Sequence, residues 1–146
     1  PQVSIGYLNR PEENKQAFRE GWFYTGDVGR MDEKGIIYLL DRKKDMIVSG
    51  GENIYTSEVE AVLYQHPDIQ ECAVVGIPDD KFGEALFATI VVASGKTLTQ
   101  TDIIKHCRDK IGGFKIPRQM DFVKEMPKSA MGKILKNELR RIYGSK

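Results

Sequence analysis

The sequence has few of the residue types that most readily identify a function. Among its 146 residues only two are cysteine and two are histidine, and Cys72 and Cys107 lie far apart without a CxxC or Cys/His ligand spacing. This pattern predicts no metal site and no disulfide framework. We expect two buried, reduced thiols, as is usual in cytosolic proteins, and therefore a cytoplasmic location.

An excess of charge of one sign and a long apolar segment are also missing. The chain has 22 basic and 21 acidic residues, and this near balance argues against nucleic acid or an anionic membrane as a partner. The longest apolar run, Ala85 to Ala93, is broken by Thr89 and has less than half the ~20 residues of a transmembrane helix. No signal peptide precedes Pro1, which begins in what reads as mid-domain sequence, so we expect a fragment of a longer protein.

The residues before position 41 predict small β structure. Pro11 opens a short helix that is expected to stop near Gly21, and an aromatic cluster follows at 22–24. Val28–Met31 and Ile36–Leu40 read as the two strands of a hairpin whose loop uses Gly35. This stretch is too short for a second domain and looks like the end of something larger.

Residues 41–45 (DRKKD) are polar or charged and lie between two apolar, strand-like runs, a pattern that predicts a joint between two units. Beyond the joint, the pattern predicts a β-turn-β, α, β, β, α, β, α order, with helices at about 57–65, 101–111 and 134–143. Ser57 and Glu60 have the spacing of a capping box, and Phe87 and Phe122 are expected in the core. The predicted fold is α+β: a domain of about 100 residues with a short mixed sheet flanked by about three helices.

Three polar clusters carry candidate chemistry, and each also has a plain structural interpretation. Thr25-Gly26-Asp27 places a carboxylate on a turn, where it could bind the two hydroxyls of a ribose or only close the turn. The segment 127–133 (PKSAMGK) presents a lysine after a glycine, suited to a phosphoryl or carboxylate group, although it lacks the Walker spacing and could be solvated. Gly50-Gly51 could admit a ligand close to the backbone or form an ordinary hairpin turn.

The order and spacing of four motifs raise the functional interpretations together. WFYTGD, DRKKDMIVSGGENIYTSEVE, GIPDDKFGE and PKSAMGK follow one another along the chain. In this order they strongly resemble the C-terminal part of the adenylate-forming acyl-CoA synthetases, a superfamily that also contains luciferases and the adenylation domains of peptide synthetases. The resemblance covers essentially the whole chain.

The resemblance implies two domains with different roles. Residues 1–44 would be the end of the large N-terminal AMP-binding domain, and residues 45–146 the mobile C-terminal domain. Asp27 and Arg42 would bind the nucleotide, Lys44 would be the hinge residue, and Lys133 would act in adenylation. Coenzyme A would contact the following residues: Gly50, Gly51, Phe82, Phe114, Lys115 and Arg118.

The resemblance also implies the substrates. The full-length enzyme would adenylate a carboxylic acid with ATP and Mg²⁺, the ion being held mainly by the N-terminal domain, and would then transfer the acyl group to coenzyme A. The fragment alone is expected to be inactive. The alternatives are a small α+β interaction or regulatory module without a catalytic role, or an adenylation domain of a peptide synthetase; a luciferase-like oxygenase also stays open.

Overall fold

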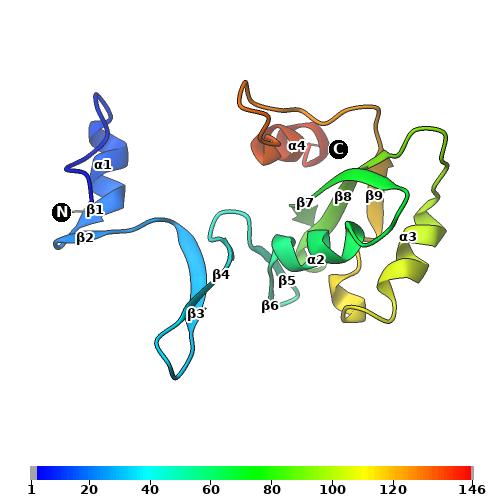
Figure 1. The fold of residues 1–146 in the computed structure, drawn as a ribbon, viewed down its shortest axis with the longest axis horizontal. Coiled ribbons are helices and arrows are strands. Elements are labelled where there is room, and N and C mark those ends of the chain that lie inside the picture. The colour runs from blue at the N-terminus through cyan, green and yellow to red at the C-terminus, as the bar shows by residue number, and fades with distance from the viewer. Residues whose placement is uncertain (1–2, 146) are drawn as a thin grey trace. The chain divides into compact units, whose positions relative to one another are not determined.

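The computed structural model describes residues 3–145, and the chain divides into two units (Figure 1). One unit ends at Lys44 and the other begins at Asp45. The first contains α1 (Pro11–Ala17), the short hairpin β1 (Phe18–Arg19) with β2 (Trp22–Phe23), and the longer hairpin β3 (Asp27–Met31) with β4 (Ile37–Arg42). The α1 helix ends earlier than predicted, because the chain turns into β1 at Phe18.

The predicted hairpin is confirmed, and its loop shows why this sequence turns here. Gly35 has a φ of +78°, a left-handed conformation that glycine adopts without strain. One carboxylate oxygen of Asp32 accepts hydrogen bonds from the backbone N–H groups of Lys34 and Ile36, each at 2.9 Å. These bonds to the ionised form hold the pKa of Asp32 below its usual value.

The second unit is built on one five-stranded sheet. Its strands are β5 (Ile47–Ser49), β6 (Glu52–Ile54), β7 (Ile69–Asp79), β8 (Gly83–Val92) and β9 (Gln119–Phe122). Along the sheet the order is β6-β5-β8-β7, all antiparallel, while β9 pairs with β8 in parallel. The sheet is therefore mixed, and its long β8 strand is buried and central, as its apolar sequence predicts.

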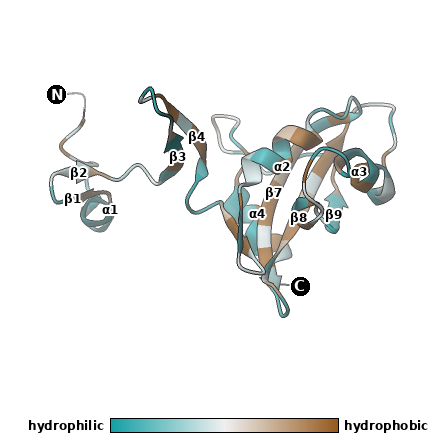
Figure 2. Ribbon diagram, turned by 90° about the horizontal axis from the view of Figure 1, so that it is seen from below, coloured by the Kyte–Doolittle hydropathy of each residue, from teal (hydrophilic) through white to brown (hydrophobic). Residues whose placement is uncertain are grey.

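Helices cover both faces of this sheet (Figure 1). On one face α2 (Thr56–Leu63) and α3 (Gln100–Cys107) bury side chains such as Val59 and Ile103. On the other face α4 (Lys136–Tyr143) packs Leu139 and Tyr143 into a second cluster. The hydrophobic strands between these helices stand out in Figure 2. The structure thus confirms the predicted α+β fold and element order, with a short 3-10 turn η1 (Gly113–Lys115) before β9.

Two local predictions were wrong. The start of α2 has no capping box: its N-cap is Tyr55, without a side-chain cap, and Glu60 instead accepts a 2.8 Å hydrogen bond from the Val74 N–H on β7. The capping box of this fold lies at Thr99 and Asp102, at the start of α3. Phe122, the last residue of β9, is 37% exposed rather than buried, whereas Phe87 is in the core as predicted.

Within residues 3–145 the structure contains neither a membrane-spanning helix nor a cluster of metal-ligand side chains. No helix in this range combines the length and apolarity needed to cross a bilayer. The same residues contain no group of three His, Cys, Asp or Glu side chains that could hold a metal ion.

Candidate functional site

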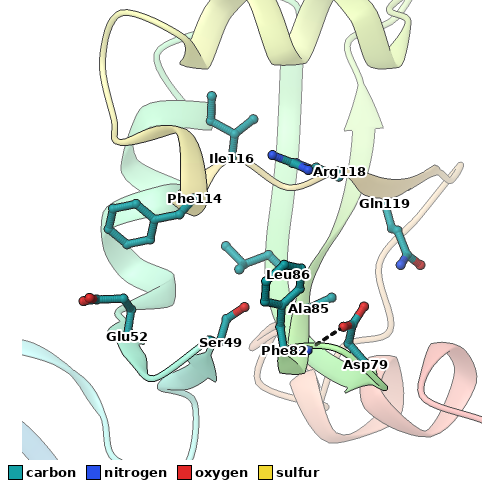
Figure 3. Close-up of a pocket in the computed structure, with 11 residues that line it drawn as sticks. Ser49, Glu52, Asp79, Phe82, Ala85, Leu86, Phe114, Ile116, Arg118 and Gln119 are labelled. Carbon is teal, nitrogen blue, oxygen red and sulfur yellow. Dashed lines mark hydrogen bonds between the residues drawn. The ribbon is translucent and has the colours of Figure 1, made fainter.

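A pocket of about 410 Å³ opens in the second unit beside the start of β8 (Figure 3). Two aromatic side chains from different segments, one arginine and two carboxylates border it, so it offers ring faces and charges of both signs to a ligand. The lining residues are Ser49, Gly50, Glu52, Asp79, Phe82, Ala85, Leu86, Phe114, Ile116, Arg118 and Gln119.

The glycine turn forms one wall of this pocket. Gly50 and Gly51 join β5 to β6 with φ values of +60° and +86°, which favour glycine in a tight hairpin. The Gly50 N–H donates to the carbonyl of Phe82 at 2.9 Å, and a Cβ on Gly50 would lie 3.3 Å from the Phe82 ring. Gly51 faces open space and does not line the pocket. The absent side chain at Gly50 thus lets the aromatic ring lie close to bare backbone.

Phe82 is held by the loop between β7 and β8. One carboxylate oxygen of Asp79 accepts from the N–H groups of Lys81 and Phe82 at 3.0 and 2.8 Å, the latter drawn as a dashed line in Figure 3. The Phe82 ring remains 45% exposed, and the Lys81 ammonium lies 5.0 Å from its centroid. Asp79 therefore presents an accessible ring at a defined place.

The opposite wall comes from η1 and the segment after it. Phe114 is 55% exposed and lines the pocket together with Arg118. Lys115 does not line it: its ammonium lies 2.7 Å from both carboxylate oxygens of Glu58 on α2. Of the six residues predicted to contact coenzyme A, four therefore meet at one pocket, while Gly51 and Lys115 lie outside its lining.

The predicted lysine loop is a compact turn with an exposed Lys133. Backbone bonds run from Ser129 N–H to the Lys133 carbonyl and from Gly132 N–H to the Ser129 carbonyl, at 2.8 and 2.9 Å. The Lys133 N–H donates to the Ser129 hydroxyl at 3.2 Å, and Gly132 has a φ of +79°. The loop is thus ordered by its own backbone, and its lysine is presented to the surface rather than buried.

The pocket and the lysine loop lie at opposite ends of β8. Ala85 and Leu86 line the pocket at the start of this strand. In the lysine loop, Lys128 forms a 2.6 Å ion pair with Glu71, whose cross-strand partner Val91 is near the end of β8. At about 3.3 Å per strand residue, the β8 residues beside the pocket and the β8 residue opposite Glu71 are about 20 Å apart.

The first unit brings Asp27 and Arg42 together. The Arg42 Nε lies 2.9 Å from Asp27 Oδ1, and its Nη1 donates to the Thr25 carbonyl at 3.3 Å. Gly26, with a φ of +77°, accepts from the Lys43 N–H at 2.8 Å and so fixes the turn. Asp27, Arg42 and Lys44 border the same hollow in this unit. A carboxylate and a guanidinium side by side can together bind hydroxyl and phosphate or ring groups of one nucleotide.

Neither cysteine is placed to act as a reactive thiol. Burial raises the pKa of Cys72 to about 12 and also raises the pKa of Cys107. Both are free, buried thiols, as the sequence predicts, and neither lines the pocket. Any thiol chemistry at this site would therefore have to come from a ligand.

Sequence reasoning gave no role to Asp79 and Glu84. Both belong to GIPDDKFGE, one of the four motifs that carry the resemblance, but the hydrogen bonds they make depend on the folded loop and sheet.

Comparison with known proteins identifies the family. Residues 58–133 match the AMP-binding enzyme C-terminal domain. The chain is 43% identical over 142 residues to 2-succinylbenzoate–CoA ligase of Geobacillus kaustophilus, covering 97% of this chain and 29% of that protein. It is 46% identical over 139 residues to long-chain-fatty-acid–CoA ligase of Bacillus subtilis, covering 95% of this chain and 25% of that protein.

A solved structure agrees with these relatives. ATP-bound MatB from Rhodopseudomonas palustris matches with a TM-score of 0.86 and 36% identity, over 96% of this chain and 28% of that one. The chain thus spans less than a third of the length of the relatives it matches. The chain therefore belongs to the family of AMP-binding enzyme C-terminal domains.

Proposed function

We propose that this chain is the C-terminal part of an AMP-forming acid–thiol ligase. The full-length enzyme would join a carboxylate to the α-phosphorus of MgATP with release of pyrophosphate. It would then pass the acyl group to the sulfur of coenzyme A with release of AMP and a proton. The observation that carries the proposal is the placement of two distinct sites, an exposed lysine loop and an aromatic pocket, at opposite ends of one strand.

Lys133 is the group we assign to the first step. When a carboxylate attacks the α-phosphorus, negative charge develops on the oxygens of both partners, and one ammonium in contact with both stabilises it and aligns them. An exposed lysine on a loop that is ordered by its own backbone can enter an active site supplied by another part of the protein. Mg²⁺ would accompany ATP as part of the substrate, bound mainly by the N-terminal domain.

The pocket is the site that we assign to coenzyme A. The Phe82 and Phe114 rings can flank an apolar pantetheine or stack on the adenine, and Arg118 can pair with a phosphate. Gly50 leaves room beside the Phe82 ring for a narrow thiol arm. We assign Lys115 a smaller part, because its ammonium is paired with Glu58, and Gly51 supports the turn rather than the lining.

The pocket and the lysine loop adjoin β8 at points about 20 Å apart, so they cannot serve one reaction centre from a single orientation. We therefore propose that residues 45–146 form a mobile domain that turns about Lys44 between the two steps. Residues 1–44 would be the end of the large AMP-binding domain, with Asp27 and Arg42 binding ATP. Two observations support this assignment. The chain divides into two units between Lys44 and Asp45, and Asp27, Arg42 and Lys44 border one hollow in the first unit.

The partners follow from the reaction. The enzyme would use ATP, coenzyme A and a carboxylic acid, and it would act in the cytoplasm, where ATP and reduced coenzyme A are available. By their names, the two ligases compared above act on unlike acids, an aromatic acid and long-chain fatty acids. The identity of the carboxylic acid is therefore a question for a substrate screen.

The test is pyrophosphate exchange into ATP by the full-length protein with a panel of carboxylic acids. The Lys133→Ala variant is expected to lose exchange, while Lys124→Ala, an exposed lysine just before the loop, is the matched control. Unchanged exchange in Lys133→Ala would remove the role assigned to this residue. A full-length protein that forms no adenylate with any acid would favour the interaction module, and acyl transfer to a carrier protein but not to coenzyme A would favour the peptide-synthetase alternative.

A further inference from the structure

We propose that Glu84 is a positioning residue for the pocket. Its carboxylate fixes strand β5, and with it the Ser49–Gly51 turn, against the start of β8. The inference rests on the proposed function only in taking this pocket as the coenzyme A site. Glu84 does not line the pocket, so it would act through the backbone that does.

The contact between β5 and β8 is short, and a side chain extends it. The two strands are registered at one residue pair, Ser49 with Gly83. One residue earlier in β5, the Val48 N–H donates to Glu84 Oε2 at 2.8 Å. A carboxylate acceptor thus extends the hydrogen-bonded contact beyond that pair. Because the acceptor is a carboxylate, this bond is stronger than an ordinary backbone bond.

Gly76 makes room for this arrangement. Gly76 is buried on β7 and pairs with Leu86, while Glu84 pairs with Pro78, so Glu84 and Gly76 are diagonal neighbours on the same face. A Cβ on Gly76 would lie 2.7 Å from Glu84 Oε1, closer than such atoms can approach. The carboxylate occupies the space that a side chain at position 76 would fill.

Two walls of the pocket adjoin the strand that Glu84 holds through Val48. The Gly50 N–H, two residues after Val48, donates to the Phe82 carbonyl at 2.9 Å, and the Phe82 ring packs close to Gly50. If β5 moves away from β8, the glycine turn and the aromatic ring lose their mutual contact. β5 is also the first strand after the boundary at Lys44.

The experiment uses the full-length enzyme with the variants Glu84→Ala, Glu84→Gln and Gly76→Ala. The matched control is Glu125→Ala, which changes an exposed glutamate of the same unit. Two quantities are measured for each: the KM for coenzyme A in thioester formation, and the amide hydrogen exchange rates of Val48 and Gly50. Pyrophosphate exchange provides the reference for the first half-reaction.

Glu84→Ala should raise the KM for coenzyme A about tenfold or more and speed exchange at both amides, because the loss of a hydrogen bond to a charged group has effects of this size. Gly76→Ala should act in the same direction, since its methyl group displaces the carboxylate. Glu84→Gln should come close to the parent enzyme, because its amide oxygen still accepts from Val48. The ratio of thioester formation to pyrophosphate exchange should fall in Glu84→Ala and Gly76→Ala, but not in Glu84→Gln.

Unchanged amide exchange in Glu84→Ala would overturn the positioning role, whatever the enzyme activity. A fall in both half-reactions by the same factor would also overturn it, because this would indicate general damage to the fold. If the amides exchange faster but even the parent forms no coenzyme A thioester, the positioning of β5 stands and the proposed function fails.

Discussion

Glu60 joins three elements of the second unit, and its replacement tests the packing that supports the lysine loop. Its Oε1 accepts from the Val74 N–H on β7 at 2.8 Å and lies 2.8 Å from the ammonium of Lys136 on α4. Tyr64 binds the same edge of β7: its hydroxyl donates to the carbonyl of Cys72 and accepts from the Cys72 N–H, each at 3.2 Å. Since Lys136 lies three residues after Lys133, Glu60 also anchors the base of the lysine loop.

The cost of Glu60→Ala can be worked from these contacts. Val74 is fully buried, so its N–H would lose its partner away from water, at a cost of about 1–3 kcal/mol. Lys136 would keep its 2.8 Å bond to the Thr56 hydroxyl, so the lost ion pair adds only about 1 kcal/mol. We expect a total of about 2–4 kcal/mol, a large share of the ~5–15 kcal/mol that stabilises a typical domain.

The assay is urea unfolding of the 146-residue chain, followed by circular dichroism. With a slope of about 1–3 kcal/mol per M urea, the midpoint of Glu60→Ala should fall by about 1 M or more. Glu60→Gln should lose only about 1 kcal/mol, because its amide oxygen can still accept from Val74, and Glu125→Ala should leave the midpoint unchanged. A loss below about 0.5 kcal/mol in Glu60→Ala, or equal losses in the Ala and Gln variants, would refute the reasoning.

Further predictions concern the thiols, pH and the core. Cys72 and Cys107 should resist a thiol reagent at pH 8 in the native chain and react fully in urea, because burial raises both pKa values; fast native labelling would contradict this. Burial and the 2.8 Å hydrogen bond to Asp121 raise the pKa of Tyr143 from 10.0 to about 12. The stability this contributes is fully present below pH 10 and is lost between pH 10 and 12, so Tyr143→Phe should flatten the alkaline fall in unfolding free energy. Leu139→Ala should cost about 3–5 kcal/mol in urea unfolding through the cavity it leaves, and a loss under about 1 kcal/mol would show that α4 is loosely packed.

Most of the fold could be predicted because it follows from local patterns. Apolar runs gave the order of strands and helices, and Gly35 gave the hairpin. The failures involve partners distant in the sequence. Ser57 and Glu60 have the spacing of a capping box, but the spacing cannot say that β7 offers Glu60 an unpaired N–H. Phe122 is an apolar residue of a predicted strand, but it lies at the end of β9 and is exposed there.

The same distinction applies to the candidate site. The resemblance pointed to Phe82, Phe114 and Arg118, which the fold brings to one pocket from separate segments. It could not reveal that Glu58, 57 residues away in sequence, engages the Lys115 ammonium. The role we infer for Glu84 likewise depends on strand register, because its partner Val48 lies 36 residues earlier. Contacts across the sheet are set by tertiary packing, which a motif does not encode.

The proposed separation of two chemistries on one mobile domain is tested most directly by measuring both half-reactions in two variants of the full-length enzyme. Lys133→Ala should lower acyl-adenylate formation by about 10²–10³-fold. It should still convert a supplied acyl adenylate to thioester at nearly the parent rate. Phe114→Ala should do the reverse, with normal adenylation and a raised KM for coenzyme A. If either variant slows both half-reactions equally, the two sites do not act in separate steps.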